Sequence, residues 1–158
     1  MSQARFSSLR YIVFISLLIG ACASFSATGR ITGTLMASLA LAWCWVPVLH
    51  VVVARAVAGR RADILLSAHA PWSIWLIAAS AGAGLFGFAA YGWMVWLALL
   101  PIAITARIVY VFCRDVLNLP PRPALRRTLL HQGITWFAAA IYLDRAVSLW
   151  PRILGMWL

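Results

Sequence analysis

Five long apolar stretches, separated by short segments that contain arginine, constrain the fold of this chain more than any other feature. They cover residues 11–28, 31–54, 71–90, 93–113 and 129–149. A helix needs about 20 apolar residues to cross the hydrocarbon core of a bilayer. With 65% hydrophobic and only 10% charged residues, the chain is also too apolar for a soluble domain of its length. The sequence therefore predicts an all-α integral membrane protein, in which residues 1–158 form one bundle of five transmembrane helices.

The segments between the apolar stretches predict how the helices are connected. We expect the polar segments 55–70 and 114–128 to be cytoplasmic loops. Only Tyr91 and Gly92 separate the third stretch from the fourth, which predicts a tight antiparallel hairpin. The alternative is a bundle of four spans, with the last apolar stretch lying along the membrane surface.

The distribution of basic residues predicts the orientation. All thirteen are arginine, and an N-terminus inside the cell places ten of them on cytoplasmic segments. Because cytoplasmic loops are enriched in basic residues, we expect the N-terminus inside and the C-terminus outside, in a bacterial cytoplasmic (inner) membrane. The arginines flank apolar stretches and form no continuous basic patch, which argues against nucleic acid as a partner.

The first apolar stretch has a second interpretation. A basic start, an apolar core and the residues Ile19 to Cys22 resemble a cleavage site, after which Cys22 would carry a lipid. An uncut first helix explains the same residues, and we adopt it. The three cysteines, Cys22, Cys44 and Cys113, are odd in number and scattered, so they predict no disulfide framework.

Small residues and arginines predict contacts with neighbouring helices and with lipid. A small-residue stripe in the third stretch predicts a helix-packing face or a dimer interface, and it consists of Ala79, Ala83, Gly84 and Gly87. Anionic lipid headgroups are the expected partners of the arginines in the polar segments, namely Arg60, Arg61, Arg122, Arg126 and Arg127.

Three histidines form the sharpest candidate for a cofactor site. The predicted topology places His50, His69 and His131 near the cytoplasmic face, with His50 about 6 Å inside the end of its helix. They could hold haem b, a metal ion or an anionic headgroup. No motif with metal-ligand spacing contains them, and histidines at a membrane boundary are common. In that interpretation Pro71 starts a helix, and His69 lies just outside the bilayer.

Ionisable residues inside predicted spans are the second candidate, because their burial in lipid is costly. They are Asp144 and Arg145 in the last stretch, Arg107 in the fourth, and Arg30 at the start of the second. Asp144 is expected either to pair with Arg30 or to relay protons or a substrate. Arg107 can reach the inner headgroups with its long side chain.

No catalytic motif occurs, so the sequence offers no candidate catalytic residues and favours a protein that is not an enzyme. The first expectation is an accessory or assembly subunit of a larger membrane complex, with other membrane subunits or a second copy as partners. A transporter or channel component that acts as an oligomer is the second. A membrane redox subunit that binds haem or metal through the three histidines is the third.

Overall fold

The computed structural model describes residues 7–86 and 89–155, and within these ranges it describes the side chains of all but residues 26, 79–98 and 143–155. The described residues contain helices and no strand, as the sequence predicts. The α-helices are α1 (Ser8–Thr28), α2 (Gly33–Trp43), α3 (Trp45–Ala58), α4 (Ala62–Phe86), α5 (Ala89–Val111) and α6 (Pro121–Gly155). A 3₁₀ turn, Gly59–Arg61, joins α3 to α4, and a π-helical turn, Phe112–Val116, follows α5.

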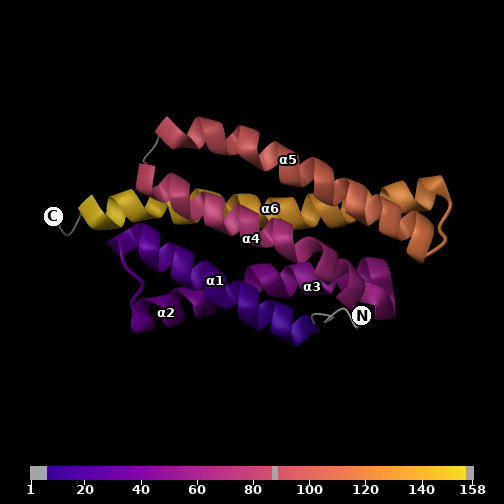
Figure 1. The fold of residues 1–158 in the computed structure, drawn as a ribbon, viewed down its shortest axis with the longest axis horizontal. Helices are drawn as coiled ribbons and strands as arrows, with labels where there is room; N and C mark the ends of the chain where they lie inside the picture. Colours follow the sequence, from indigo (N-terminus) through magenta and orange to yellow (C-terminus); the bar gives the residue numbers. More distant parts are fainter. Residues whose placement is uncertain (1–6, 87–88, 156–158) are drawn as a thin grey trace.

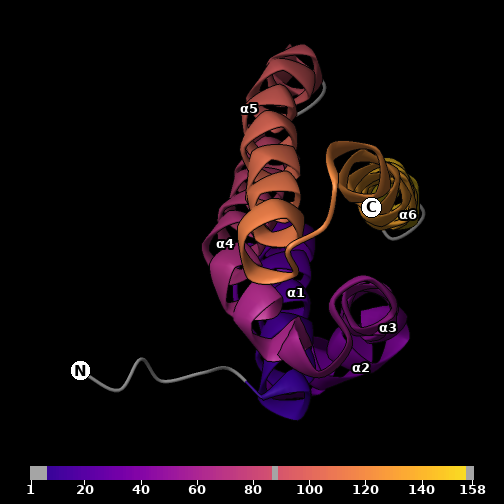
Figure 2. The same cartoon turned by 90° about the vertical axis from the view of Figure 1, so that its right-hand side faces the viewer.

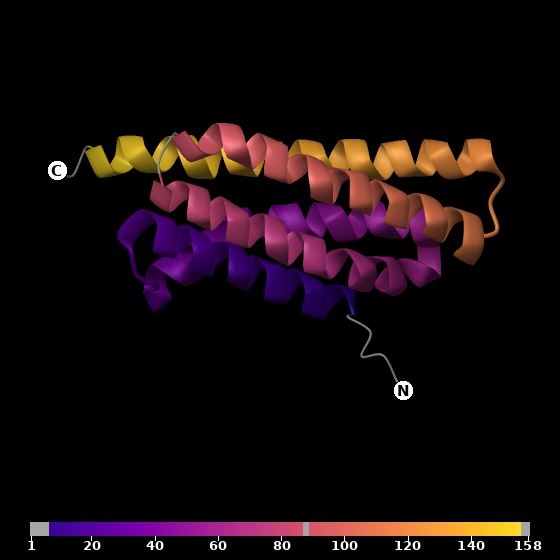
Figure 3. The same ribbon diagram turned by 45° about the horizontal axis from the view of Figure 1, so that its top comes forward.

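The helices lie lengthwise beside one another (Figure 1 and Figure 3). The N-terminal end of α1 and the C-terminal end of α6 lie toward opposite ends of the long axis (Figure 1). Helix α1 packs against α2 and α4, and α6 packs against α3 and α5. In the end-on view, α4 and α5 form one row, with α6 and α3 beside it (Figure 2). The buried core lies between α1, α3, α4, α5 and α6.

The second apolar stretch forms two consecutive helices, whereas the sequence predicted one continuous helix over 31–54. The break lies at Cys44, between α2 and α3. Pro47 explains its position, because a proline has no N–H to donate to the carbonyl four residues earlier, here that of Trp43, and its ring clashes with that carbonyl. The two helices continue in the same general direction along the molecule (Figure 1).

The segment 55–70 is helical through almost its whole length, although the sequence predicted a polar loop. Helix α4 begins at Ala62 and passes through Pro71, which therefore lies inside the helix and not in its first turn. The reason is burial: Leu65 and Leu66 are fully buried in the core, so this segment is an inward-facing part of the bundle. Asp63 in the first turn also favours a helix start there.

The chain reverses between α4 and α5 earlier than the sequence predicted. Tyr91 and Gly92 lie within α5, and the connection falls between Phe86 and Ala89. The two helices pack against each other, as expected for a hairpin. The last predicted helix also starts eight residues early, since α6 begins at Pro121, inside the segment 114–128 predicted as a loop, and continues without a break past the segment 129–149.

One close helix contact lies outside the predicted small-residue stripe. A Cβ atom on Gly20 of α1 would lie 2.9 Å from the Cβ of Ala40 and would collide with the carbonyl oxygen of Met36. Gly20 therefore allows the backbones of α1 and α2 to touch, which is how membrane helices commonly associate. The packing contacts predicted for Ala79, Ala83, Gly84 and Gly87 lie outside the residues whose side chains the structure describes.

Two segments of the described chain are long and apolar enough to cross a membrane, judged by length and composition. They are Ser8–Phe25 and Gly33–Ala78. Large apolar side chains are exposed on the outer surface of the bundle as well as buried within it; Leu9, Leu41 and Phe137 are examples, at 71, 74 and 69% exposure.

Candidate metal centre

Three helices bring the three histidines of the chain to one point. His50 lies on α3, His69 on α4 and His131 on α6. Each histidine belongs to the inward-facing row of its helix. His50 precedes the buried Ala54 by one turn, and His69 follows the buried Leu65 by one turn. The packing of these rows therefore places the imidazoles inside the bundle.

The imidazole rings contact one another edge to face. Their centroids lie 5.2 Å apart for His50 and His69, 5.2 Å for His50 and His131, and 4.9 Å for His69 and His131. One nitrogen of each ring can be chosen so that all three atoms lie within 4.8 Å of one another. Among the described residues, no further histidine, cysteine or carboxylate joins this group. We call these three residues the histidine cluster.

Most of the imidazole nitrogens in the histidine cluster lack a hydrogen-bond partner. Within the described part of the chain, Nε2 of His50, Nε2 of His69 and both ring nitrogens of His131 are buried and unpaired. His131 is fully buried, and His69 is only 4% exposed. A buried polar atom without a partner costs about 1–3 kcal/mol, so a cluster of four such atoms needs a physical explanation.

The Tyr11 hydroxyl contacts the ring of His50, and Ser73 holds this hydroxyl in turn. The Tyr11 hydroxyl lies 2.7 Å from Nδ1 of His50 and 2.9 Å from Oγ of Ser73. Ser73 in turn donates to the backbone carbonyl of His69, 3.4 Å away. If Nδ1 of His50 carries the proton, it donates to the Tyr11 oxygen, and the Tyr11 hydroxyl donates to Ser73. Nε2 of His50, which is buried without a partner, is then left with a free lone pair.

A second buried polar group follows His131 along α6. Oε1 of Gln132 accepts a hydrogen bond from Nε1 of Trp136 at 2.6 Å and lies 3.2 Å from Oγ1 of Thr105. Gln132 Nε2 is buried without a partner among the described residues. This group ties α5 to α6 beside the histidine cluster.

The geometry decides between the cofactors considered from the sequence. Haem iron has only two axial positions, on opposite faces of the porphyrin, so haem would use at most two of the three histidines. The three rings also touch one another, with centroids at most 5.2 Å apart. Three converging imidazoles suit a single ion instead, as in zinc sites with three histidine ligands.

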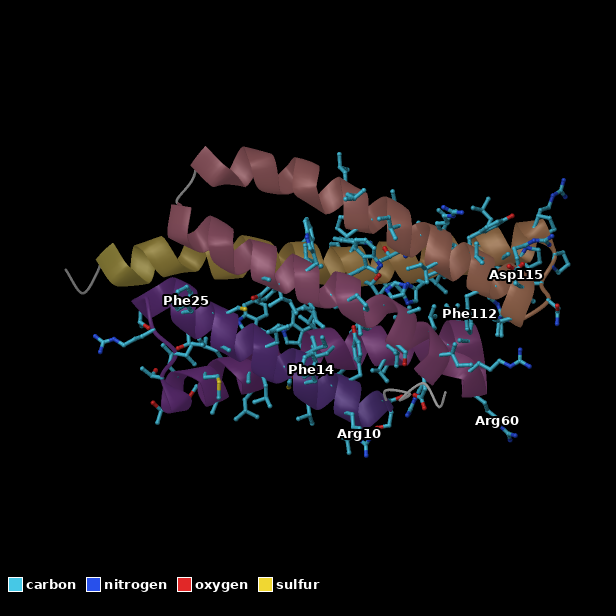
Figure 4. All side chains as sticks on the ribbon, in the orientation of Figure 1. Arg10, Phe14, Phe25, Arg60, Phe112 and Asp115 are labelled. Carbon is cyan, nitrogen blue, oxygen red and sulfur yellow. The ribbon has the colours of Figure 1, made fainter. Side chains whose placement is uncertain are left out.

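Several arginines predicted to meet lipid headgroups contact the protein backbone. Arg61 donates to the carbonyl of Val116, and Arg127 donates to the carbonyl of Val57, 2.7 Å away, near the end of α3. Arg60, Arg122 and Arg126 are exposed. Arg60 and Asp115 lie toward the same end of the molecule, whereas Phe25 lies toward the other (Figure 4).

The ionisable residues predicted inside the membrane do not join the histidine cluster. Arg107 on α5 and Arg30, which lies between α1 and α2, are both exposed. Asp144 and Arg145 belong to α6, but their side chains lie outside the described set, so the predicted pair between Asp144 and Arg30 is not tested.

Sequence reasoning placed the three histidines near one face but missed Tyr11 and Ser73. Tyr11 stands at the start of an apolar stretch, where a tyrosine usually indicates the membrane interface. Its distance of 39 residues from His50 hides their contact. One signal was available: Ser73 lies one helical turn after His69, and is therefore on the same face if residues 69–73 form a helix.

Comparison with protein-family models, curated proteins and solved structures found no match to this chain. The site is therefore interpreted from its own geometry.

Proposed function

We propose that this protein is a membrane protein that binds one divalent transition-metal ion through His50, His69 and His131. Two observations carry this proposal: each of the three rings has a nitrogen within 4.8 Å of those of the other two, and the cluster contains buried imidazole nitrogens that lack a hydrogen-bond partner. A metal ion accepts a lone pair from one nitrogen of each ring and so offsets much of the cost of leaving these atoms without partners.

The alternative is a histidine cluster with a purely structural role. A neutral imidazole has one donor and one acceptor, so three adjacent rings could in principle hydrogen-bond to each other. The edge-to-face arrangement does not use this option, since the buried nitrogens of His131 have no partner among the described residues. An apolar residue would fill such a position at lower cost, which favours a ligand role.

The three imidazole ligands limit which metal ions the site is expected to bind. Imidazole nitrogens suit zinc, copper, nickel and iron, whereas calcium and magnesium prefer oxygen ligands. Zinc–nitrogen bonds of about 2.0–2.1 Å in a tetrahedral site separate the ligand atoms by about 3.3 Å. The ligand atoms of the histidine cluster already lie within 4.8 Å, so modest rotations of the rings bring them to bonding distance.

The membrane arrangement is part of the same proposal. We propose five spans, with α1 as the first, α2 and α3 together as the second, and α4, α5 and α6 as the others. Two observations support it: the apolar composition of Ser8–Phe25 and Gly33–Ala78, and the exposure of large apolar side chains over the outside of the bundle. Helices that are apolar on all sides are typical of membrane spans. A role as an accessory subunit is compatible with this arrangement and stays a prediction.

Metal analysis of the purified protein tests the function. The chain is purified in detergent without an affinity tag that contains histidine, equilibrated with Zn²⁺, Cu²⁺, Ni²⁺ or Co²⁺, and desalted. We expect about one ion per chain for the unchanged protein. We expect a strongly reduced content when His50, His69 or His131 is replaced with glutamine, which has a similar size.

A matched control separates the histidine cluster from other metal-binding groups. Cys44→Ser removes a half-buried thiol that lies outside the cluster, so this variant should keep its full metal content. Circular dichroism and gel filtration show whether each variant is folded. Folded glutamine variants that retain the metal would overturn the proposal.

A further inference from the structure

A cavity lies beside the histidine cluster, within the bundle. Its volume is about 90 Å³, and side chains from α1, α3, α4, α5 and α6 form its walls. His50 and His69 belong to these walls, together with Tyr11 and Ser73, whereas His131 does not. The cavity therefore reaches the histidine cluster from the side of His50 and His69, and His131 lies away from it.

This arrangement defines the free position of a bound ion. A zinc-like ion held by three protein ligands keeps a fourth position for water or another ligand. The three ligands of the cluster come from α3, α4 and α6, and among the described residues no fourth protein ligand is present. We infer that the fourth coordination position faces the cavity and takes a small monovalent anion, such as hydroxide; this inference rests on the proposed metal site.

The positive charge of the bound ion is the reason why we expect its fourth ligand to be an anion. Three neutral imidazoles leave the two positive charges of the ion uncompensated. The described residues that line the cavity include no aspartate, glutamate or arginine. Most of the other walls are apolar, with Ile15, Ile19 and Leu76 among them. In a surrounding of low polarity, an uncompensated divalent charge strongly attracts an anion.

Size restricts the ligand to a few atoms. A water molecule needs at least about 10–15 Å³ of such space, so a cavity of 90 Å³ holds a small cluster of waters or a ligand of a few non-hydrogen atoms. Polar groups on the walls are mostly engaged elsewhere. Thr105 and Thr135 donate to backbone carbonyls of their own helices, and the Trp136 ring N–H donates to Gln132. The ion itself is thus the main attraction for a ligand.

Azide binding to the cobalt-loaded protein tests this inference. Co²⁺ occupies zinc-type sites, and its visible spectrum responds to a change of ligand. We expect sodium azide to change the spectrum of the cobalt-loaded protein in a saturable way, with one azide per ion. A cobalt spectrum that does not respond to azide overturns the inference while leaving the proposed metal site intact.

Two neighbouring alanines on α6 provide a matched pair of variants. Ala139 lines the cavity, whereas Ala140 is exposed. Ala139→Leu should weaken azide binding at least tenfold without loss of cobalt, because the larger side chain fills the cavity. Ala140→Leu should bind azide like the unchanged protein. Equal azide binding by both variants would show that the fourth position faces elsewhere. Absence of any cobalt spectrum in the unchanged protein would instead refute the proposed function.

Discussion

His131 is fully buried on α6, and neither of its ring nitrogens has a partner within the described part of the chain. A residue in this position lowers the stability of the metal-free protein, because two polar atoms have lost their hydrogen bonds to water. Such a cost is common at functional sites, where side chains are arranged for a ligand and not for the stability of the fold.

This cost leads to a prediction about His131→Leu. We expect the metal-free variant to be more stable than the metal-free unchanged protein by about 1–3 kcal/mol, since an apolar side chain of similar size replaces unpaired polar atoms. Metal should no longer stabilise the variant. Unfolding in detergent, followed by circular dichroism with and without Zn²⁺, measures both effects. If His131→Leu destabilises the metal-free protein, the histidine has a structural role.

Tyr11 contacts His50, one of the proposed metal ligands, although the two residues are 39 positions apart in the sequence. Tyr11→Phe removes the hydrogen bonds to His50 and Ser73 but keeps the aromatic ring that packs against His50. We expect metal affinity to fall about 10–100-fold, with the stoichiometry unchanged, as for other groups that orient a metal-binding histidine. Competition with a chromophoric chelator measures the affinity. Phe14→Leu is a suitable control, because Phe14 is on the same helix but is exposed. Equal affinities for the two variants would contradict the role of Tyr11.

The composition of the site was only partly predictable from the sequence. The expected topology brought His50, His69 and His131 to one side of the membrane, but it placed His69 just before a helix and not buried within one. That difference came from Pro71, which resembles a helix start and instead lies inside α4. Local signals cannot reveal that Leu65 and Leu66 are buried by other helices, and this burial carries the helix back to Ala62.

At the scale of single helices, Gly20 fixes how closely α1 and α2 pack. We expect Gly20→Ala to lower the free energy of unfolding by about 1–3 kcal/mol, because the new Cβ collides with backbone atoms that cannot rotate away. Gly133→Ala is the control. Gly133 lies inside α6, and a Cβ atom added there would meet no described atom within 4 Å, so alanine should stabilise the helix by about 0.5–1 kcal/mol. Thermal unfolding of both variants in detergent checks these opposite signs.

Two adjacent arginines near the start of α6 provide a test of a contact between helices. Both are exposed, but Arg127 also donates to the carbonyl of Val57, near the end of α3. We expect Arg127→Ala to destabilise the fold by about 1 kcal/mol, since the end of a helix loses a charged donor. Arg126→Ala should change stability by less than about 0.5 kcal/mol. Chemical unfolding in detergent compares the pair, and equal effects would argue against the importance of the Arg127 contact.

For the molecule as a whole, the proposed arrangement of five spans makes a simple topological prediction. An odd number of spans puts the two ends of the chain on opposite sides of the membrane, whereas four spans put them on the same side. We expect an alkaline phosphatase domain fused to the C-terminus, which is active only outside the cytoplasm, to be active. The same domain fused after Arg60 should be inactive. Activity only in the fusion after Arg60 would contradict the predicted orientation.

Most of the fold could be anticipated because the apolar stretches are long and clearly separated. What the sequence did not reveal were the breaks and continuities inside these stretches. Pro47 interrupts a helix, yet Pro71 and Pro101 lie within helices. A proline breaks a helix only when nothing else holds the flanking turns in place, and that depends on neighbours that are distant in the sequence.

The order of the ligands along the chain has a consequence for biosynthesis. His50 and His69 precede the third ligand, His131 on α6, in the order of synthesis. With two histidines alone, the proposed site would bind an ion weakly, and the third histidine would complete it after α6 has packed against α3. Metal capture would therefore follow the packing of α6, and the ion would link this helix to those inserted before it.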